Sequence, residues 1–414
     1  MTLDTSAFNP MLKEHYAPGP VANMAFQKNK AIGLMTKRNR KPSGEGGGKY
    51  WVQPIQYADP GGGSSDFATA NAYTDAQSLY VAFQVSRKKH YRVAKVENEV
   101  IEATAEGNMD AFEPAFDEFD RAIRAEGNYL NFRFFRTSGG YIGRMSNSSF
   151  ATAVLTLDDP AGCWGVRKND VVNLSATDGT SGSLKAGSLK VLSVQRRAGT
   201  ITMTGNISAG VATAAQNDYV FLAGDFGLGC SGLLDWVPDS APGATLFYNV
   251  DRTADADMLG GLRVDATNGE PVHETLVNMV VAADELGAEP DVCFANPRAL
   301  GTLTKQLEGK WIIMKGQGYG GSEADIGYKG WQVTLEGHEV TIFSDRTCPV
   351  KRLFMLQLDT WTMFSAGMAP NFIQKKAGSI IKPSETSDGF EGRIGEYFNF
   401  SCKAPGWNVN AQLQ

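Results

Sequence analysis

The spacing of apolar residues changes twice along this chain of 414 residues, and that change limits the folds open to it. Between Leu79 and Val85, apolar side chains alternate with other residues, as in a half-buried strand. From Met109 to Ile123 they recur every three or four positions, as on one face of a helix. Over about 149–225 the alternation returns in short runs separated by turns. These segments predict an α+β protein.

The helical stripe carries phenylalanines and is predicted to face a core. Phe112, Phe116 and Phe119 lie on one side, and charged residues lie on the other. Pro114 lacks an N–H group and clashes one turn back, so we expect a bend or a fresh first turn between Asp110 and Pro114. This spacing is typical of any core-facing helix and does not indicate a cofactor site.

Two strand-like segments flank a glycine-rich stretch and predict a long hairpin. The first begins at Tyr50, and the second contains the alternating run from Leu79. The tip is predicted to be loose until something outside holds it, because glycine and serine restrict the backbone least. An ordinary exposed hairpin remains the alternative. The tip residues are Gly61, Gly62, Gly63, Ser64 and Ser65.

The second half of the chain divides into an all-β insertion and a mixed segment. Runs such as SLKVLSVQ and GTITMTG within 149–225 predict a small barrel or sandwich inserted into a larger host. Downstream, an apolar helix is followed by a short strand and a second helix. Asn296 is the predicted N-cap of that second helix, and Pro297 is its first residue.

Composition and motifs exclude several classes of chemistry. Both GK dipeptides are followed by an aromatic residue, Tyr50 or Trp311, so no P-loop is present. The GCSG segment is not a nucleophile elbow, and we interpret Ser231 as a turn residue. His273 precedes Glu274 without a second histidine four residues on, which excludes a zincin. We therefore predict no catalytic, cofactor-binding or metal-binding residue, no cofactor and no enzymatic activity.

Charge and cysteine usage point to a protein made in the cytoplasm with local basic surfaces only. Thirty-nine basic residues against 45 acidic ones give a net charge of −6, so the chain as a whole does not attract nucleic acid. The five cysteines form no CxxC pair and are predicted to be buried free thiols. No secretory signal or membrane span is visible.

The densest basic run predicts a contact patch. Its members, which either touch phosphates non-specifically or pair with acidic neighbours in the same or an adjacent subunit, are Arg87, Lys88, Lys89 and Arg92. His90 and Tyr91 stand between them. No signature for reading bases accompanies the run.

The order of these segments resembles the HK97-type major capsid protein of tailed bacteriophages. The stretch VENEVIEATAEGNMDAFEPAFDEFDRAIRAEGN resembles the spine-helix region of that family, and LVNMVVAADELGAEPDVCFANPRALGTL resembles its axial-domain helix, strand and capped helix. The closing GEYFNFSCKAPGWNVNA resembles its last strand. The resemblance covers most of the chain and rests on order and spacing.

The resemblance implies a division of the chain into the segments of a coat protein. These are an N-terminal arm at 1–45, an extended loop at 46–95, a peripheral domain with the spine helix at 96–148, an inserted β domain at 149–225, an axial domain at 226–372 and the return strands of the peripheral domain at 373–414.

The same resemblance implies a function and partners. The chain is expected to assemble through pentamers and hexamers into the icosahedral head of a virion around double-stranded DNA, which it contacts non-specifically. The hairpin tip, Gly61–Ser65, is expected to form contacts between subunits. A portal protein, a possible decoration protein and a separate scaffolding protein are the implied partners. The alternatives are a soluble hydrolase or carbohydrate-active enzyme with an appended β-sandwich module, and a tail or decoration protein.

Overall fold

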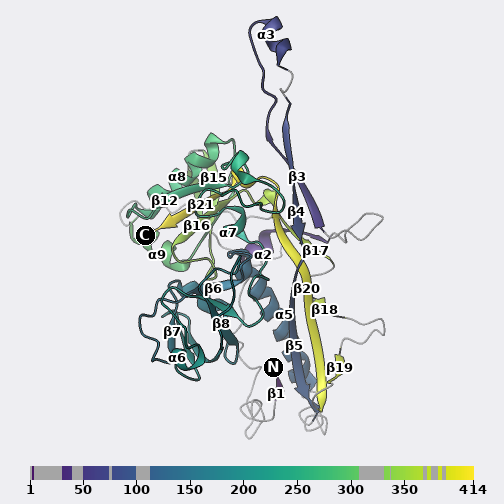
Figure 1. Cartoon of the computed structure of the whole chain (residues 1–414), viewed down its shortest axis with the longest axis vertical. Coiled ribbons are helices and arrows are strands. Elements are labelled where there is room, and N and C mark those ends of the chain that lie inside the picture. Colours follow the sequence, from purple (N-terminus) through teal and green to yellow (C-terminus); the bar gives the residue numbers. More distant parts are fainter. Residues whose placement is uncertain are drawn as a thin grey trace.

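The structure is a computed structural model of the chain. Figure 1 shows a long hairpin that projects away from two rounded bodies, and a ribbon of two long strands along one side. The described residues are 2–3, 30–39, 50–73, 77–98, 112–306, 331–335, 337–366, 371–373, 381–384 and 388–414.

A seven-stranded sheet is built around the longest strand, β20 (Gly389–Cys402). Its first part pairs antiparallel with β5 (Lys88–Glu97), from Gly389 opposite Glu97 to Phe398 opposite Lys88. Its last part pairs with β17 (Trp361–Ser365). The remaining strands are β1 (Thr2–Leu3), β2 (Thr36–Asn39), β18 (Asn371–Phe372) and β19 (Ile381–Pro383).

The long helix α5 (Phe112–Phe134) packs on β5 and β20. It begins inside the predicted window, with Pro114 as its third residue, where a missing N–H costs no helical hydrogen bond. Phe119 is buried against Val96 and Ile394, so the interpretation of this part of the stripe as core is confirmed. Met109 lies outside the described residues. The short helix α2 (Lys30–Leu34) packs beside α5.

A six-stranded mixed sheet buries both of its faces. On β13 (Val292–Ala295), Cys293 and Ala295 face the helices α8 (Val272–Glu285) and α9 (Pro297–Gln306), while Val292 and Phe294 face a second core. As predicted, Asn296 caps α9, its Oδ1 accepting from the N–H of Arg298 at 3.1 Å. The other strands are β12 (Leu262–Ala266), β14 (Trp331–Leu335), β15 (His338–Ser344), β16 (Arg352–Leu356) and β21 (Val409–Leu413).

A second six-stranded sheet forms the lower body in Figure 1 and has its own core. Met145 and Leu157 form an isolated antiparallel bridge next to its two edge strands, which brings those edges together. The 3₁₀-helix η2 (Pro160–Gly165) and the helix α6 (Ile207–Gly210) complete it. In sheet order the strands are β6 (Tyr141–Arg144), β11 (Tyr219–Leu222), β8 (Val171–Ser175), β9 (Leu189–Gln195), β10 (Thr200–Met203) and β7 (Val154–Thr156).

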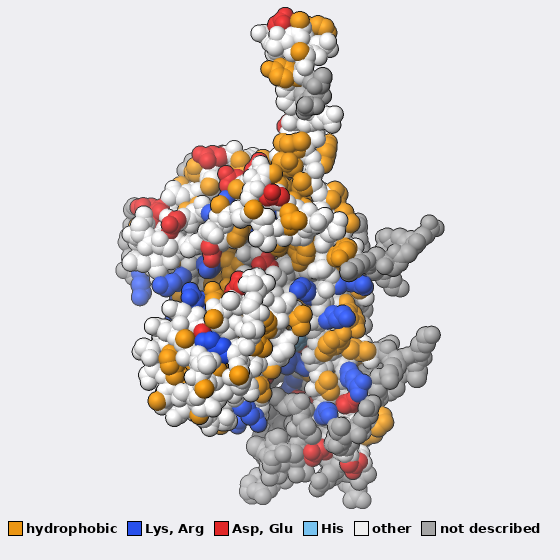
Figure 2. Space-filling model, in the orientation of Figure 1, with side chains coloured by type: hydrophobic (Ala, Val, Ile, Leu, Met, Phe, Trp, Pro, Cys, Tyr) orange, Lys and Arg blue, Asp and Glu red, His pale blue; other side chains and the backbone are white. Residues whose placement is uncertain are grey.

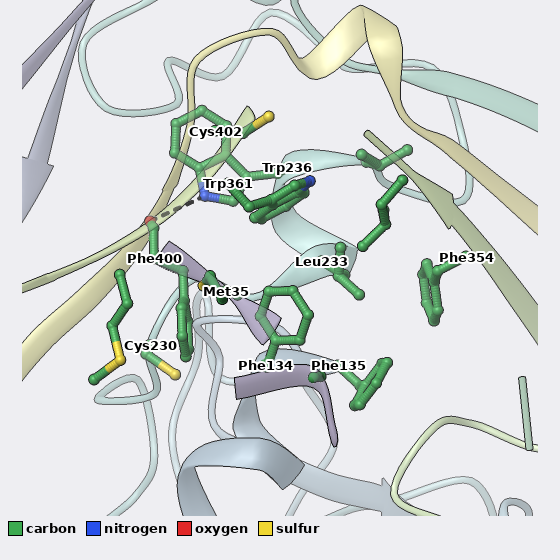
Figure 3. Close-up of a cluster of buried hydrophobic side chains, with 14 of the residues drawn as sticks. Met35, Phe134, Phe135, Cys230, Leu233, Trp236, Phe354, Trp361, Phe400 and Cys402 are labelled. Atoms are coloured by element: carbon green, nitrogen blue, oxygen red, sulfur yellow. Dashed lines mark hydrogen bonds between the residues drawn. The ribbon is translucent and has the colours of Figure 1, made fainter. Parts of the chain in front are cut away.

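One aromatic core joins elements from distant parts of the chain (Figure 3). Phe134, at the end of α5, lies 5.4 Å from Trp361 of β17 and 5.1 Å from Phe400 of β20, measured between ring centroids. Trp236, in the helix α7 (Leu233–Trp236), donates its indole N–H to the Phe400 carbonyl at 3.2 Å. Such tilted ring contacts add to the area that they bury.

All five cysteines are buried and free, as predicted. Cys230 and Cys402 lie in the aromatic core of Figure 3. Burial raises the pKa of the Cys293 and Cys402 thiols to about 12, so both are protonated at neutral pH.

Three segments lie in a different sheet from the one that their predicted domain implies. β5, placed in the extended loop, pairs with β20 instead. β17, placed in the axial segment, also joins β20, and β21, placed among the return strands, joins β12 and β16. β6 begins at Tyr141, before the expected insertion boundary at 149. Apolar alternation predicts a strand but carries no information about its partner, which is chosen by contacts far away in sequence.

The aromatic core generates a stability prediction. Replacing Phe134, which is 0% exposed, with alanine leaves a cavity between α5, β17 and β20, and should lower the free energy of unfolding by about 3–5 kcal/mol. Leu246→Ala, at a side chain 58% exposed, should change it by less than about 0.5 kcal/mol. Denaturant unfolding of both variants checks this. Equal effects at the two positions would contradict the role given to the core.

Candidate functional site

The projecting hairpin is formed by β3 (Tyr50–Ala58) and β4 (Leu79–Ser86). The strands pair antiparallel, from Tyr50 opposite Ser86 to Gln56 opposite Tyr80. Within the described residues neither strand pairs with a third strand. Near the base, the Gln84 N–H of β4 donates to the Tyr248 carbonyl at 3.0 Å. A two-stranded hairpin is marginally stable alone, so its order must come from its base.

The base of the hairpin is anchored in the aromatic core. Trp51 stacks on Phe364 of β17 at a centroid distance of 5.6 Å, and Phe83 contacts Trp236 at 5.1 Å. Trp51 and Phe83 are buried, as is Val85. Phe83 and Val85 of the alternating run are therefore buried as the pattern predicts, whereas Leu79 at the far end of the run is 47% exposed.

A buried asparagine joins the hairpin base to β20. The Nδ2 of Asn399 donates to the Ser86 carbonyl and to the Tyr248 hydroxyl, both at 2.7 Å. Its Oδ1 accepts from the N–H of Ser231 at 3.0 Å. Ser231 is only 1% exposed, so its interpretation as a simple turn residue was wrong: it is part of this network. No local motif predicts the network, because its members are up to 313 residues apart.

The tip of the hairpin contains a short helix that sequence reasoning missed. The helix α3 (Phe67–Ala72) is capped by Asp66, whose Oδ2 accepts from the N–H of Thr69 at 2.9 Å. Of the predicted tip residues, Gly62 has a φ of +83°, a conformation that glycine adopts without strain. Gly61 and Gly63 face open space. The available signal was an aspartate followed by an alanine-rich run.

The hairpin exposes large apolar side chains along its length (Figure 2). Phe67 at the tip is 84% exposed, and Tyr80 on β4 is 67% exposed. Exposed apolar side chains that gather in one place mark surfaces that bind another molecule. The other exposed apolar residues of this hairpin are Tyr50, Val52, Tyr73 and Leu79.

The predicted basic patch is split between the two faces of β5. Arg87 and Lys89 are exposed, whereas Lys88 and Arg92 are half-buried. Lys88 donates to the Gly227 carbonyl at 3.4 Å, and desolvation lowers its pKa. The Nε of Arg92 donates to Glu126 of α5 at 2.9 Å. Because side chains alternate along a strand, Lys88 and Arg92 lie on the face of β5 that α5 covers, and Lys89 lies on the opposite face.

Comparison with known proteins yields likenesses in structure only. The sequence matches no protein-family model and no curated protein. The fold matches a chain of the capsid asymmetric unit of cyanophage A-1(L) over 99% of both chains, with 12% identity and a TM-score of 0.55. Looser likenesses cover 99% of this chain. One is the capsid of an empty GTA particle, with 97% of that chain covered, 10% identity and a TM-score of 0.48. Another is the holo-SrpI encapsulin complex from Synechococcus elongatus PCC 7942, with 95% of that chain covered, 10% identity and a TM-score of 0.44.

The cyanophage match extends over the whole chain, so it covers the hairpin, the long ribbon and both bodies together. The chain has the HK97-type capsid fold. The fold class predicted from the sequence, a mixed arrangement of this type, is thereby confirmed at the level of the overall fold.

The asparagine network of this HK97-type fold generates a second prediction. Asn399→Leu leaves the Ser86 carbonyl and the Ser231 N–H buried without partners, so the free energy of unfolding should fall by about 3 kcal/mol. Backbone amides at the base of β3 and β4 should also exchange faster with solvent. Denaturant unfolding and hydrogen exchange measure the two effects.

The matched control is Asn173→Leu, at a position near solvent where water replaces the lost bond to the Gly187 carbonyl. It should cost less than about 1 kcal/mol. Unchanged amide exchange at the hairpin base in Asn399→Leu would show that the network does not hold the hairpin.

Proposed function

We propose that this chain is the major capsid protein of a tailed bacteriophage, which assembles through pentamers and hexamers into an icosahedral head around double-stranded DNA. The observation that carries the proposal is the fold match to a phage capsid chain over 99% of both chains. The projecting apolar hairpin supports it independently, because a surface of that kind needs a partner to cover it.

The sheets suggest how the segments serve a shell. The hairpin 50–86 corresponds to the extended loop, and α5 with the seven-stranded sheet corresponds to the peripheral domain. The sheet covered by α8 and α9 corresponds to the axial domain. The sheet that spans 141–222 corresponds to the insertion, which we place on the outer surface. The proposed arm, 1–45, lies mostly outside the described residues.

A closed shell places identical chains in slightly different surroundings, so a stiff body with an adaptable contact element suits it. Here β5, β20 and α5 form the stiff part, packed through a shared core. The hairpin is fixed at its base and projects from the body, so its exposed apolar side chains can reach a neighbouring subunit. The tip residues Gly61–Ser65 are proposed contacts within that reach.

The exposed part of the basic set is the proposed contact for packaged DNA. Arg87 and Lys89 can meet phosphates without reading sequence, whereas Lys88 and Arg92 already contact groups of this chain. A portal protein, a separate scaffolding protein and a decoration protein remain proposed partners. The proposed location is the virion, after synthesis in the host cytoplasm. No described helix is long and apolar enough to cross a membrane.

Electron microscopy with light scattering tests the proposed function directly. The purified chain, alone and co-expressed with candidate scaffolding proteins, should form closed shells or free pentamers and hexamers. Rings or tubes would favour a tail protein instead. Monomers and dimers under every condition would overturn the capsid proposal and return the enzyme alternative to first place.

The exposed side chains of the hairpin yield a sharper prediction. Phe67→Ser combined with Tyr80→Ser should leave the thermal unfolding temperature within a few degrees of the parent, because both side chains are mostly in solvent. The same variant should lose assembly, seen as a shift from shells or capsomers to single chains in light scattering.

Leu192→Ser is the matched control, since Leu192 is 50% exposed on β9 of the inserted sheet. It should assemble normally if that sheet lies on the outer surface. Shells of normal size from the Phe67 and Tyr80 variant would contradict the role of the hairpin between subunits.

A further inference from the structure

Three chemically active side chains converge where α5 crosses β5 and β20. His90 of β5 and Glu396 of β20 are directly opposite each other in the antiparallel register, so their side chains share a face of the sheet. Glu126 of α5 lies over that face and pairs with His90 Nδ1. One ligand atom from each of the three residues lies within 4.8 Å of the other two.

Glu396 is the unusual member of this cluster. The residue is 1% exposed, and neither of its carboxylate oxygens receives a hydrogen bond from the described residues. Burial, together with the negative charge of Glu126, raises its pKa to about 10. Burying a carboxyl group without a hydrogen-bond donor costs folding free energy, and such groups usually bind a proton, a cation or a ligand.

The other two ligands are held in place by their surroundings. Arg92 Nε donates to Oε2 of Glu126 at 2.9 Å, which leaves Oε1 directed at His90. The His90 ring stacks on Tyr129, with ring centroids 3.9 Å apart and an interplanar angle of 19°. Tyr129 is itself held by Asp225, which accepts from its hydroxyl at 2.8 Å. Supporting contacts of this kind orient the ligands of metal sites.

We propose that His90, Glu126 and Glu396 form a zinc site that fastens the long helix α5 to the strands β5 and β20. One imidazole and two carboxylates are a donor set that Zn²⁺ accepts, with water as the fourth ligand. Tetrahedral zinc with bonds of about 2 Å places its ligand atoms about 3.3 Å apart, and the ligand atoms of this cluster lie within 4.8 Å of one another.

The net charge of the cluster and its access to solvent fit a zinc site. Arg92 offsets one of the two carboxylate charges, so the cluster with a neutral imidazole carries one net negative charge when both glutamates are ionised. The His90 side chain is 19% exposed and provides a route from solvent. This inference does not depend on the proposed capsid function. It departs from our expectation from sequence that the chain has no metal ligand.

The test uses the full chain, stripped with a chelator and then titrated with Zn²⁺ in a calorimeter. We expect one Zn²⁺ per chain and a higher unfolding temperature with Zn²⁺ than with the chelator. Glu396→Gln and His90→Gln should each weaken Zn²⁺ affinity at least ten-fold, and circular dichroism should confirm that both variants fold. Co²⁺ in place of Zn²⁺ should give the visible absorption of a tetrahedral site in the parent and lose it in both variants.

His338→Gln is the control, because His338 faces Asp284 at 3.3 Å at a separate position and its side chain is 20% exposed, close to the value for His90. It should bind Zn²⁺ as the parent does. Absence of stoichiometric binding to the parent would overturn the proposal and leave Glu396 as a protonated partner of Glu126. Parent-like affinity in Glu396→Gln would overturn it as well.

Discussion

The pairing of β20 with two different neighbours is the constraint on which the rest of the structure depends. Its first part pairs with β5 and brings Ile394 under α5, while its last part pairs with β17 and carries Phe400 into the aromatic core. Between these points, Asn399 bonds to the base of the hairpin. One continuous ladder of hydrogen bonds therefore sets the positions of the helix, the hairpin and the core.

The molecule combines tightly packed sheets and helices with one projecting hairpin. The ribbon and α5 are packed against each other, and the sheet under α8 and α9 is buried on both faces. The hairpin is packed against the core as far as Ile55, and its tip keeps Phe67 in solvent. Exposed apolar area is unfavourable in water, and binding another molecule removes it from water. The exposed part of the hairpin is therefore the surface best suited to association, and it is also the part least fixed by the fold.

Local patterns predicted the parts of this protein whose structure depends on near neighbours. Asn296 before Pro297 predicted the start of α9, and Pro114 marked the first turn of α5. The helix α3 was missed although Asp66 offered a cap, because glycine and serine dominate the tip. The basic run was recognised as a set of charges, but the partner of Arg92 was unknown until Glu126 was placed over β5.

The sequence by itself determined the α+β class, the order of the segments and the alternation that turns Phe83 and Val85 inward, because these follow from side-chain periods within single elements. Only the tertiary structure decided that β17 belongs with β20 and that β21 belongs with β12. It also decided that His90, Glu126 and Glu396 meet, although Glu396 lies 306 positions beyond His90 in the sequence. Contacts of that kind depend on which strands pair and where a helix crosses them, and both are settled by burial summed over the whole chain.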